Sequence, residues 1–273
     1  MKNLIIRTIT GAFFVTFVIG SVIWNKWAFA ALFLIFSLLG LWEFFKIFGK
    51  NLQIGIQKYF GLLFGAFLFV SISLSAFNIM EVKFLLINVP LLFIVFIIEL
   101  FLKNKNPINN ISIILTGILY VVLPLSLLMF FFNPSFVVGV EKTAFLLGFF
   151  ILVWSNDTFA YLCGSIIGKH KLFERVSPKK TWEGSIGGAV FTVLIGFLLS
   201  KYFVDIDVID WIFISIIIVF TATIGDLTES MLKRSLKIKD AGNIFPGHGG
   251  VLDRFDSVFI AAPFVLLYLI LLI

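Results

Sequence analysis

Cysteine, histidine and charged residues are all scarce in this chain of 273 residues, and each scarcity excludes a class of protein. The single cysteine, Cys163, cannot form an intramolecular disulfide. Two histidines and one thiol cannot supply the usual ligands of a zinc site, so any bound metal is expected to have oxygen ligands. Charged residues make up 13% and hydrophobic residues 60% of the sequence, which excludes a soluble globular domain of this size.

Long apolar runs follow one another along nearly the whole chain. A helix needs about 20 apolar residues to cross the hydrocarbon core of a bilayer, so the sequence predicts an all-α polytopic integral membrane protein with about nine transmembrane helices. The expected spans lie near residues 5–24, 27–47, 59–79, 84–102, 109–132, 144–167, 184–202, 211–232 and 252–273. Lys2 and the apolar run after it resemble a secretory signal, but the next span follows at once, which favours an uncleaved first helix.

Lysine and arginine are divided unevenly between the two sides of the predicted membrane. Of the 21 in the chain, seventeen fall on the side of the N-terminus, namely Lys2, Arg7, Lys46, Lys50, Lys58, Lys103, Lys105, Lys169, Lys171, Arg175, Lys179, Lys180, Lys233, Arg234, Lys237, Lys239 and Arg254. The other side holds Lys26, Lys83, Lys142 and Lys201, together with Asp205, Asp207 and Asp210. By the positive-inside rule, we expect the N-terminus in the cytoplasm and the C-terminus outside, in the cell (inner) membrane.

The net charge of +6 is therefore mostly a signal of topology. Because the basic residues are scattered over separate loops, we expect no nucleic-acid partner. Anionic headgroups of membrane lipid are the more natural partner.

Polar residues at depth divide the chain in two. Residues 1–140 carry apolar spans in which Glu43 and Glu99 are the carboxylates, whereas residues 141–273 hold almost every other unusual polar side chain. We therefore expect residues 141–273 to form a catalytic region. Residues 1–140 would either wall a cavity or form the contact of a homodimer, and the sequence does not choose between these roles.

Asp157 stands near the middle of the span 144–167. With Tyr161, Gly164 and Gly168, it forms one stripe along a helix. A carboxylate at this depth is costly unless it is paired, hydrated or bound to a metal, which favours a functional role. The alternative is a packing stripe of small residues in which Asp157 bonds to a neighbouring helix.

A second polar face lies near the end of the span 211–232. Asp226, Glu229, Ser230 and Lys233 are spaced three or four residues apart, so they share one side of a helix. An ion pair between Glu229 and Lys233 at the membrane edge would explain those two residues alone. It would leave Asp226, which lies deeper, without a reason.

The next segment is rich in charge and glycine and leads into the last span. Its glycines would let a backbone approach phosphate closely, and a helix N-terminus offers free N–H groups to anions. Asp253 and Asp256 would repel phosphate there, so Mg²⁺ between carboxylates and phosphate oxygens is the interpretation that accommodates both. A loop that uses glycine for turns and lysine for topology would leave the two aspartates unexplained.

These residues resemble a known signature. The pattern Ser230-x-x-Lys233-Arg234-x4-Lys239-Asp240-x-Gly242-x2-Phe245-Pro246-Gly247-His248-Gly249-Gly250-x2-Asp253-Arg254-x-Asp256 is similar to that of the bacterial phosphatidate cytidylyltransferases, the CDP-diacylglycerol synthases. Asp157-x-x-Ala160-Tyr161-x-x-Gly164 and Ser177-Pro178-Lys179-Lys180-Thr181-x-Glu183-Gly184 resemble upstream motifs of that family. The specific resemblance covers about residues 144–257.

The resemblance implies a nucleotidyltransferase of phospholipid biosynthesis that moves CMP from CTP to phosphatidic acid, with Mg²⁺ and, as a further option, a second cation such as a divalent ion or K⁺. On this basis, we expect Asp226 and Asp253 to bind metal, with Asp157 and Asp256 completing or orienting the group. Lys233, Arg234, Lys239 and Arg254 would neutralise phosphate charge, and Lys179 and Lys180 would meet a substrate phosphate. Ser230, Gly247, His248, Gly249 and Gly250 complete the expected substrate-binding set.

Two other functions remain open. A CTP-dependent polyprenol or phytol kinase, or a related lipid cytidylyltransferase, would use similar groups, and a kinase would release CDP rather than pyrophosphate. An ion-coupled transporter would also place Asp157, Asp226 and Glu229 within spans. Transporters, however, usually show matching broken helices in two halves, whereas the polar residues here gather in one half.

Overall fold

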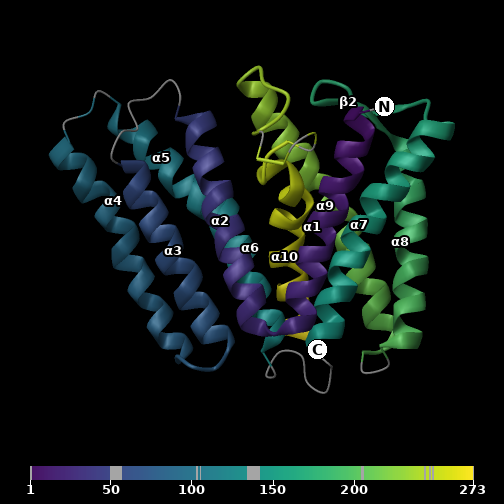
Figure 1. The fold of residues 1–273 in the computed structure, drawn as a ribbon, viewed down its shortest axis with the longest axis horizontal. Helices are drawn as coiled ribbons and strands as arrows, with labels where there is room; N and C mark the ends of the chain where they lie inside the picture. The colour runs from purple at the N-terminus through teal and green to yellow at the C-terminus, as the bar shows by residue number, and fades with distance from the viewer. Residues whose placement is uncertain are drawn as a thin grey trace. The chain divides into compact units, whose positions relative to one another are not determined.

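The computed structural model is built almost entirely of helices (Figure 1). It describes residues 2–49, 57–102, 104, 106–133, 142–203, 206–242, 244–245, 247 and 249–272, with side chains left undescribed at 2–7, 142 and 272. Across these residues, eight helices are long and apolar enough to cross a membrane, and Thr8–Trp24 forms a shorter apolar helix. The predicted all-α, multi-pass membrane protein is thereby confirmed.

The chain divides into two compact units that are discontinuous in sequence. Met1–Phe130 and Asp240–Phe255 form the first unit, and Phe131–Lys239 and Asp256–Ile273 form the second. Helix α10, Leu252–Leu272, begins in the first unit and continues in the second. The expected functional division at residue 140 lies outside the described residues and stays a prediction.

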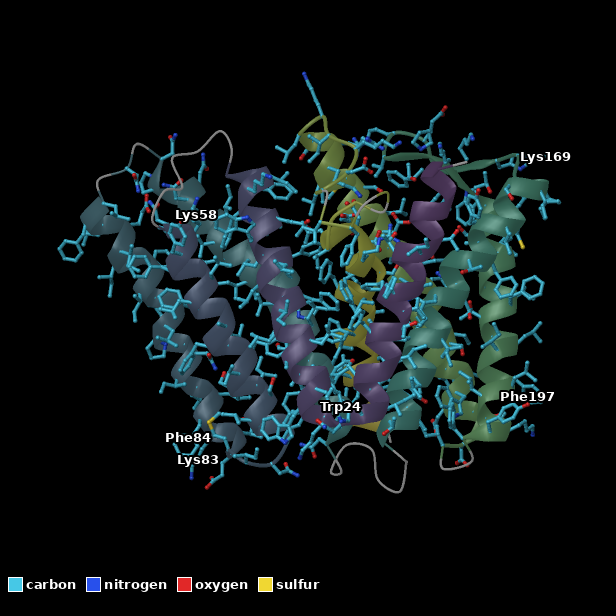
Figure 2. The ribbon with its side chains drawn as sticks, viewed as in Figure 1. Trp24, Lys58, Lys83, Phe84, Lys169 and Phe197 are labelled. Atoms are coloured by element: carbon cyan, nitrogen blue, oxygen red, sulfur yellow. The ribbon has the colours of Figure 1, made fainter. Side chains whose placement is uncertain are left out.

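Among the described residues, the first unit contains six α-helices and the glycine-rich segment, that is, residues 240–251 before α10. The α-helices are α1 (Lys2–Trp24), α2 (Lys26–Phe48), α3 (Gln57–Ala76), α4 (Asn88–Leu102), α5 (Pro107–Gly117) and α6 (Leu123–Leu127), and the 3-10 helix η1 (Val82–Ile87) precedes α4. Helix α2 begins where the Asn25 side chain accepts hydrogen bonds from the N–H groups of Trp27 and Ala28, each at 2.9 Å. Figure 2 shows Lys58 at one end of this unit and Lys83 at the other.

Aromatic rings hold the glycine-rich segment and the start of α10 within the first unit. The ring of Phe255 lies 5.2 Å from that of Phe36 and 5.4 Å from that of Phe14. Phe14 also meets Phe245 edge to face at 5.7 Å. Phe255 is 1% exposed, so the first turn of α10 is anchored by a fully buried ring.

One expected span, 109–132, is interrupted by a wider helical turn. The π-helix η2 (Ile118–Val122) follows α5, and the 3-10 helix η3 (Leu128–Phe132) follows α6. Pro124 explains the interruption because it has no N–H and its ring would clash with the carbonyl of Tyr120 in a regular α-helix. The N–H of Leu123 bonds to the carbonyl of Ile118 instead.

In the second unit, α7 (Lys142–Ile167) and α8 (Trp182–Tyr202) run side by side (Figure 1). Small residues allow this approach, because an added Cβ at Gly188 would meet the backbone oxygen of Asn156 and the Cβ of Ala160, each at 3.0 Å. Gly164 likewise packs near Gly184. The predicted packing stripe is thus present, but Tyr161 is 74% exposed and is not part of it.

A β-hairpin that the sequence did not predict joins α7 to α8. Strands β1 (Lys171–Phe173) and β2 (Ser177–Thr181) pair antiparallel, and β2 packs against α7, α8 and α9 (Val208–Ser235). Figure 2 places Lys169, beside this hairpin, and Phe197 at opposite ends of the α7 and α8 pair. The basic residues of the hairpin therefore gather at the same end of the unit as the last turns of α9.

The sidedness of the two termini stays a prediction. Some of the charges on which it rests lie outside the described residues, namely Lys50, Lys103, Lys105 and Asp205, as do the side chains of Lys2, Arg7 and Lys142.

Candidate active site

The polar face predicted near the end of α9 is confirmed. Ser230 Oγ donates to Asp226 Oδ1 at 3.2 Å, one helical turn away. Lys233 Nζ lies 2.6 Å from Glu229 Oε2, in an ion pair whose side chains are 14% and 3% exposed. The Glu229 and Lys233 pair considered from the sequence is therefore present, and a second pair, Ser230 with Asp226, lies beside it.

The hairpin adds a positive charge to this face. Lys180 Nζ on β2 lies 2.6 Å from Asp226 Oδ2, and both side chains are partly exposed. Asp226 thus accepts from Lys180 through one oxygen and from Ser230 through the other. Two predicted substrate-binding residues and one predicted metal ligand are brought together in this way. Lys179, the neighbour of Lys180, is exposed.

Helix α10 brings further carboxylates to the group. Asp256 interacts electrostatically with Asp226, Glu229 and Asp157, and its Oδ1 accepts from the N–H of Ser257 at 2.7 Å. Ser257 Oγ in turn lies 3.3 and 3.2 Å from the two carboxylate oxygens of Asp157. Asp157 therefore bonds to a neighbouring helix, as the packing interpretation expected, and also belongs to the charged group.

Gly225 explains why α9 and α10 can approach so closely. A Cβ at this position would meet the backbone oxygen of Asp256, and would lie 3.1 Å from the Cα of Ser257. The glycine precedes Asp226 directly, so the close contact sets the carboxylates of Asp226 and Asp256 near each other.

The donor chemistry of this group fits a hard cation. Asp157, Asp226, Glu229 and Asp256 outnumber Lys180 and Lys233, and carboxylate oxygens are the ligands that Mg²⁺ prefers. Among the described residues, no group of three or more histidine, cysteine or acidic side chains is arranged so that it could hold a metal ion. The excess of negative charge therefore favours a cation, while the geometry of its site stays a prediction.

Glu183 closes the base of the hairpin at the start of α8. Its carboxylate accepts from the N–H of Lys169 at 3.0 Å and from the N–H of His170, and lies 2.6 Å from His170 Nδ1. Thr181 caps the same helix by accepting from the N–H of Gly184. The motif 177–184 therefore contains the groups that hold its own loop in place.

In the first unit, Asp253 organises the glycine-rich segment. Asp253 Oδ2 accepts from the N–H groups of Ala241 at 2.9 Å and Gly250 at 2.8 Å. Gly247 and Gly249 have φ angles of +75° and +86°, which strongly favour glycine, and Gly249 lies against the Asp253 carboxylate. We expected the backbone of these glycines to approach a phosphate closely; in the structure, the backbone at Gly249 and Gly250 approaches the carboxylate of Asp253 instead.

Glu43 was not among the predicted site residues, although it lies in the same arrangement. Its Oε2 accepts from the N–H of Leu252 at 3.1 Å, and the carboxylate lies against Gly242 and Gly250. The sequence signal was its charge inside an apolar span. Nothing local connected it to a segment 209 residues away.

The remaining predicted residues lie apart from these bonds. Arg234 Nη1 donates to the carbonyl of Ile238 at 3.0 Å, where it closes the end of α9, and Lys239 is exposed. Arg254 is half-buried, and its buried Nε has no hydrogen-bond partner within the described part of the chain. His248 lies outside the described residues.

The sequence is similar to a protein family and to individual known proteins. The cytidylyltransferase family matches residues 5–272. A phosphatidate cytidylyltransferase of Staphylococcus aureus (strain COL) is 39% identical over 180 residues, which cover 65% of this chain and 66% of that protein. Those of Staphylococcus saprophyticus and Staphylococcus epidermidis (strain ATCC 12228) are 42% identical over 132 residues, which cover 48% of this chain and 50% of each relative.

The matched stretch thus spans slightly under two thirds of the first relative and half of the other two. The family match, in contrast, extends over nearly all of this sequence. The chain belongs to the cytidylyltransferase family.

Proposed function

We propose that this protein transfers CMP from CTP to phosphatidic acid, giving CDP-diacylglycerol and pyrophosphate, at the cytoplasmic face of the inner membrane. The observation that carries the proposal is the group formed by Asp157, Lys180, Asp226 and Lys233 with their acidic neighbours. It lies at the end of the second unit where the basic hairpin gathers. The names of the relatives support phosphatidate as the acceptor.

The acceptor needs little activation from the protein. A phosphate monoester is largely anionic near neutral pH, so one of its oxygens can attack the α-phosphorus of CTP without a strong base. The bond between the α- and β-phosphates breaks, and pyrophosphate leaves with its electron pair. Catalysis then rests on positioning and on neutralisation of charge.

The chain's cations have defined positions for that task. Asp226 orients Lys180, and Glu229 orients Lys233, so each ammonium group is held in place before substrate arrives. Arg254 has a buried Nε without a partner in the described residues, which leaves it a donor for a phosphate oxygen. Lys179, Arg234 and Lys239 are exposed and add charge around the triphosphate.

Asp226 and Asp256 would hold Mg²⁺, with Asp157 as a further candidate beside them. Bound there, the ion would neutralise triphosphate oxygens and the developing charge on pyrophosphate. Without a cation, these carboxylates would repel the same oxygens. The metal-binding role expected of Asp253 stays a prediction from the sequence.

The test is an assay of the purified protein with α-labelled CTP and phosphatidic acid, in which labelled lipid and pyrophosphate are measured separately. Equal amounts of both are expected, and only when Mg²⁺ is present. Asp226→Asn should lower the rate at least about 100-fold. Asp210→Asn is the matched control, because Asp210 lies at the opposite end of α9 and accepts from Tyr268 Oη at 2.7 Å. Release of CDP with a phosphorylated lipid would instead identify a kinase.

A further inference from the structure

Helix α10 begins without a conventional cap. Val251 precedes its first residue, Leu252, and a valine side chain has no acceptor for the free N–H groups of a helix N-terminus. Glu43, which lies on α2, takes that role from a distant part of the sequence, because its Oε2 accepts from the N–H of Leu252 at 3.1 Å. A carboxylate at this position also interacts favourably with the helix dipole.

The segment before α10 is shaped around the same carboxylate. Gly242 and Gly250 both lie against the oxygens of Glu43, so closely that a Cβ at either position would overlap them. Glu43 is itself 3% exposed. A buried carboxylate is costly unless hydrogen bonds compensate for its lost hydration. The backbone before and at the start of α10 donates to Glu43, whereas Glu43 Oε1 has no hydrogen-bond partner in the described part of the chain.

Glu43 therefore controls a turn that carries two proposed site residues. Asp253 and Arg254 follow Leu252 directly in the first turn of α10. Asp253 holds the other end of the segment through Ala241 and Gly250, so two carboxylates share the N–H groups of one loop. The carboxylates of Glu43 and Asp253 also interact electrostatically, so a change to either one alters the forces on the loop between them.

We propose that Glu43 is a positioning residue of the nucleotidyl-transfer site, which acts through the first turn of α10 and sets Arg254 and the glycine-rich segment for the phosphates of CTP. The proposal rests on the proposed function for its substrate, but the contact between Glu43 and the segment does not. Glu43 touches no reacting atom in this role. Its effect passes through the backbone at Leu252 and Gly250.

The matched control is Glu99. It is also a buried carboxylate of the first unit, 4% exposed, and accepts from Gln57, Asn104 and Asn110 at 2.9 to 3.0 Å. Glu99→Gln and Glu43→Gln each replace one buried charge by an amide of nearly equal volume. Both should lower the melting temperature in detergent, so a difference between them reports position rather than stability.

The first measurement is hydrogen–deuterium exchange of the substrate-free protein. Glu43→Gln should speed exchange of the amides of residues 241–252 by about tenfold, and Glu43→Ala by more, while Glu99→Gln leaves them as in the wild type. The second is steady-state kinetics, in which Glu43→Gln should raise KM for CTP by about tenfold and change kcat by less than about threefold.

The outcomes separate the two proposals. Unchanged exchange in Glu43→Gln, or equal acceleration in Glu99→Gln, would overturn the positioning role whatever the activity. Exchange could also be faster in Glu43→Gln while KM and kcat change equally in Glu43→Gln and Glu99→Gln. Glu43 would then have only a structural role, which would also overturn the proposal. If the wild type makes no CDP-diacylglycerol, the proposed function fails, and the exchange data still decide whether Glu43 holds the segment.

Discussion

Lys180 and Asp226 are joined by an ion pair of 2.6 Å between a hairpin strand and a membrane helix. The pair connects two sequence motifs that lie about one sixth of the chain apart. It holds the ammonium group at a polar face that also carries Ser230, and it leaves Lys180 partly exposed. An ammonium group fixed in this way can meet an incoming phosphate without first losing its conformational freedom.

Lys180→Met keeps the apolar stem and removes the charge. We expect kcat/KM for CTP to fall at least about tenfold, because the triphosphate loses one positioned cation. Lys171→Met is the control, since Lys171 is an exposed residue on the partner strand β1. Equal losses in the two variants would mean that the general positive charge of the hairpin matters, rather than the position of Lys180.

Gly225→Ala tests the close contact between α9 and α10. The new methyl group would meet the backbone oxygen of Asp256, which cannot move without shifting the helix. Overpacking of this kind costs about 1–3 kcal/mol, so the melting temperature and activity should fall together. Gly20→Ala is the matched helical control because nothing lies within 4 Å of its added Cβ. A Gly225→Ala protein as stable and active as the control would contradict the proposed packing.

Asp157 can be assigned by separating its charge from its hydrogen bond. Asp157→Asn keeps an acceptor for Ser257 Oγ and removes the charge, whereas Ser257→Ala removes the donor and keeps the charge. A role in metal or phosphate chemistry predicts a loss of activity of at least about tenfold in Asp157→Asn with little change in melting temperature. Full turnover in Asp157→Asn, with lower stability in Ser257→Ala, would instead support packing alone.

Glu183 should govern the order of the hairpin. Glu183→Ala removes the acceptor of the Lys169 and His170 N–H groups, so we expect faster proteolytic cleavage between residues 169 and 181 and a higher KM for substrate. Glu174→Ala is the control, because Glu174 is exposed at the turn of the same hairpin. Cleavage at the same rate in both variants would show that the Glu183 contacts do not hold the loop.

Local spacing predicted what lies on one helix. Asp226, Glu229, Ser230 and Lys233 were expected on one face because residues three and four apart are neighbours in any α-helix. In the structure, Ser230 donates to Asp226 and Lys233 pairs with Glu229, each four residues apart. The same reasoning worked for the long apolar spans. In both cases the signal lies in residues that are close together in the sequence.

Contacts between distant segments were less accessible to that reasoning. The hairpin was not predicted because its strands are short and basic, so their side chains suggested a loop that signals topology. The wide turn η2 had a signal in Pro124, since proline within an apolar run disrupts the regular hydrogen bonds. Glu43 had no signal beyond its charge inside an apolar span, because its partner Leu252 comes 209 residues later.

That separation has a consequence for the order in which the protein is made. The first unit needs Asp240–Phe255, which are synthesised after every residue of Met1–Phe130 and after most of the second unit. During translation, Glu43 enters the membrane long before Leu252 exists to donate to it. The unit made first therefore receives its last segment near the end of synthesis. A ribosome that stops before residue 240 leaves Glu43 without the Leu252 N–H that donates to it.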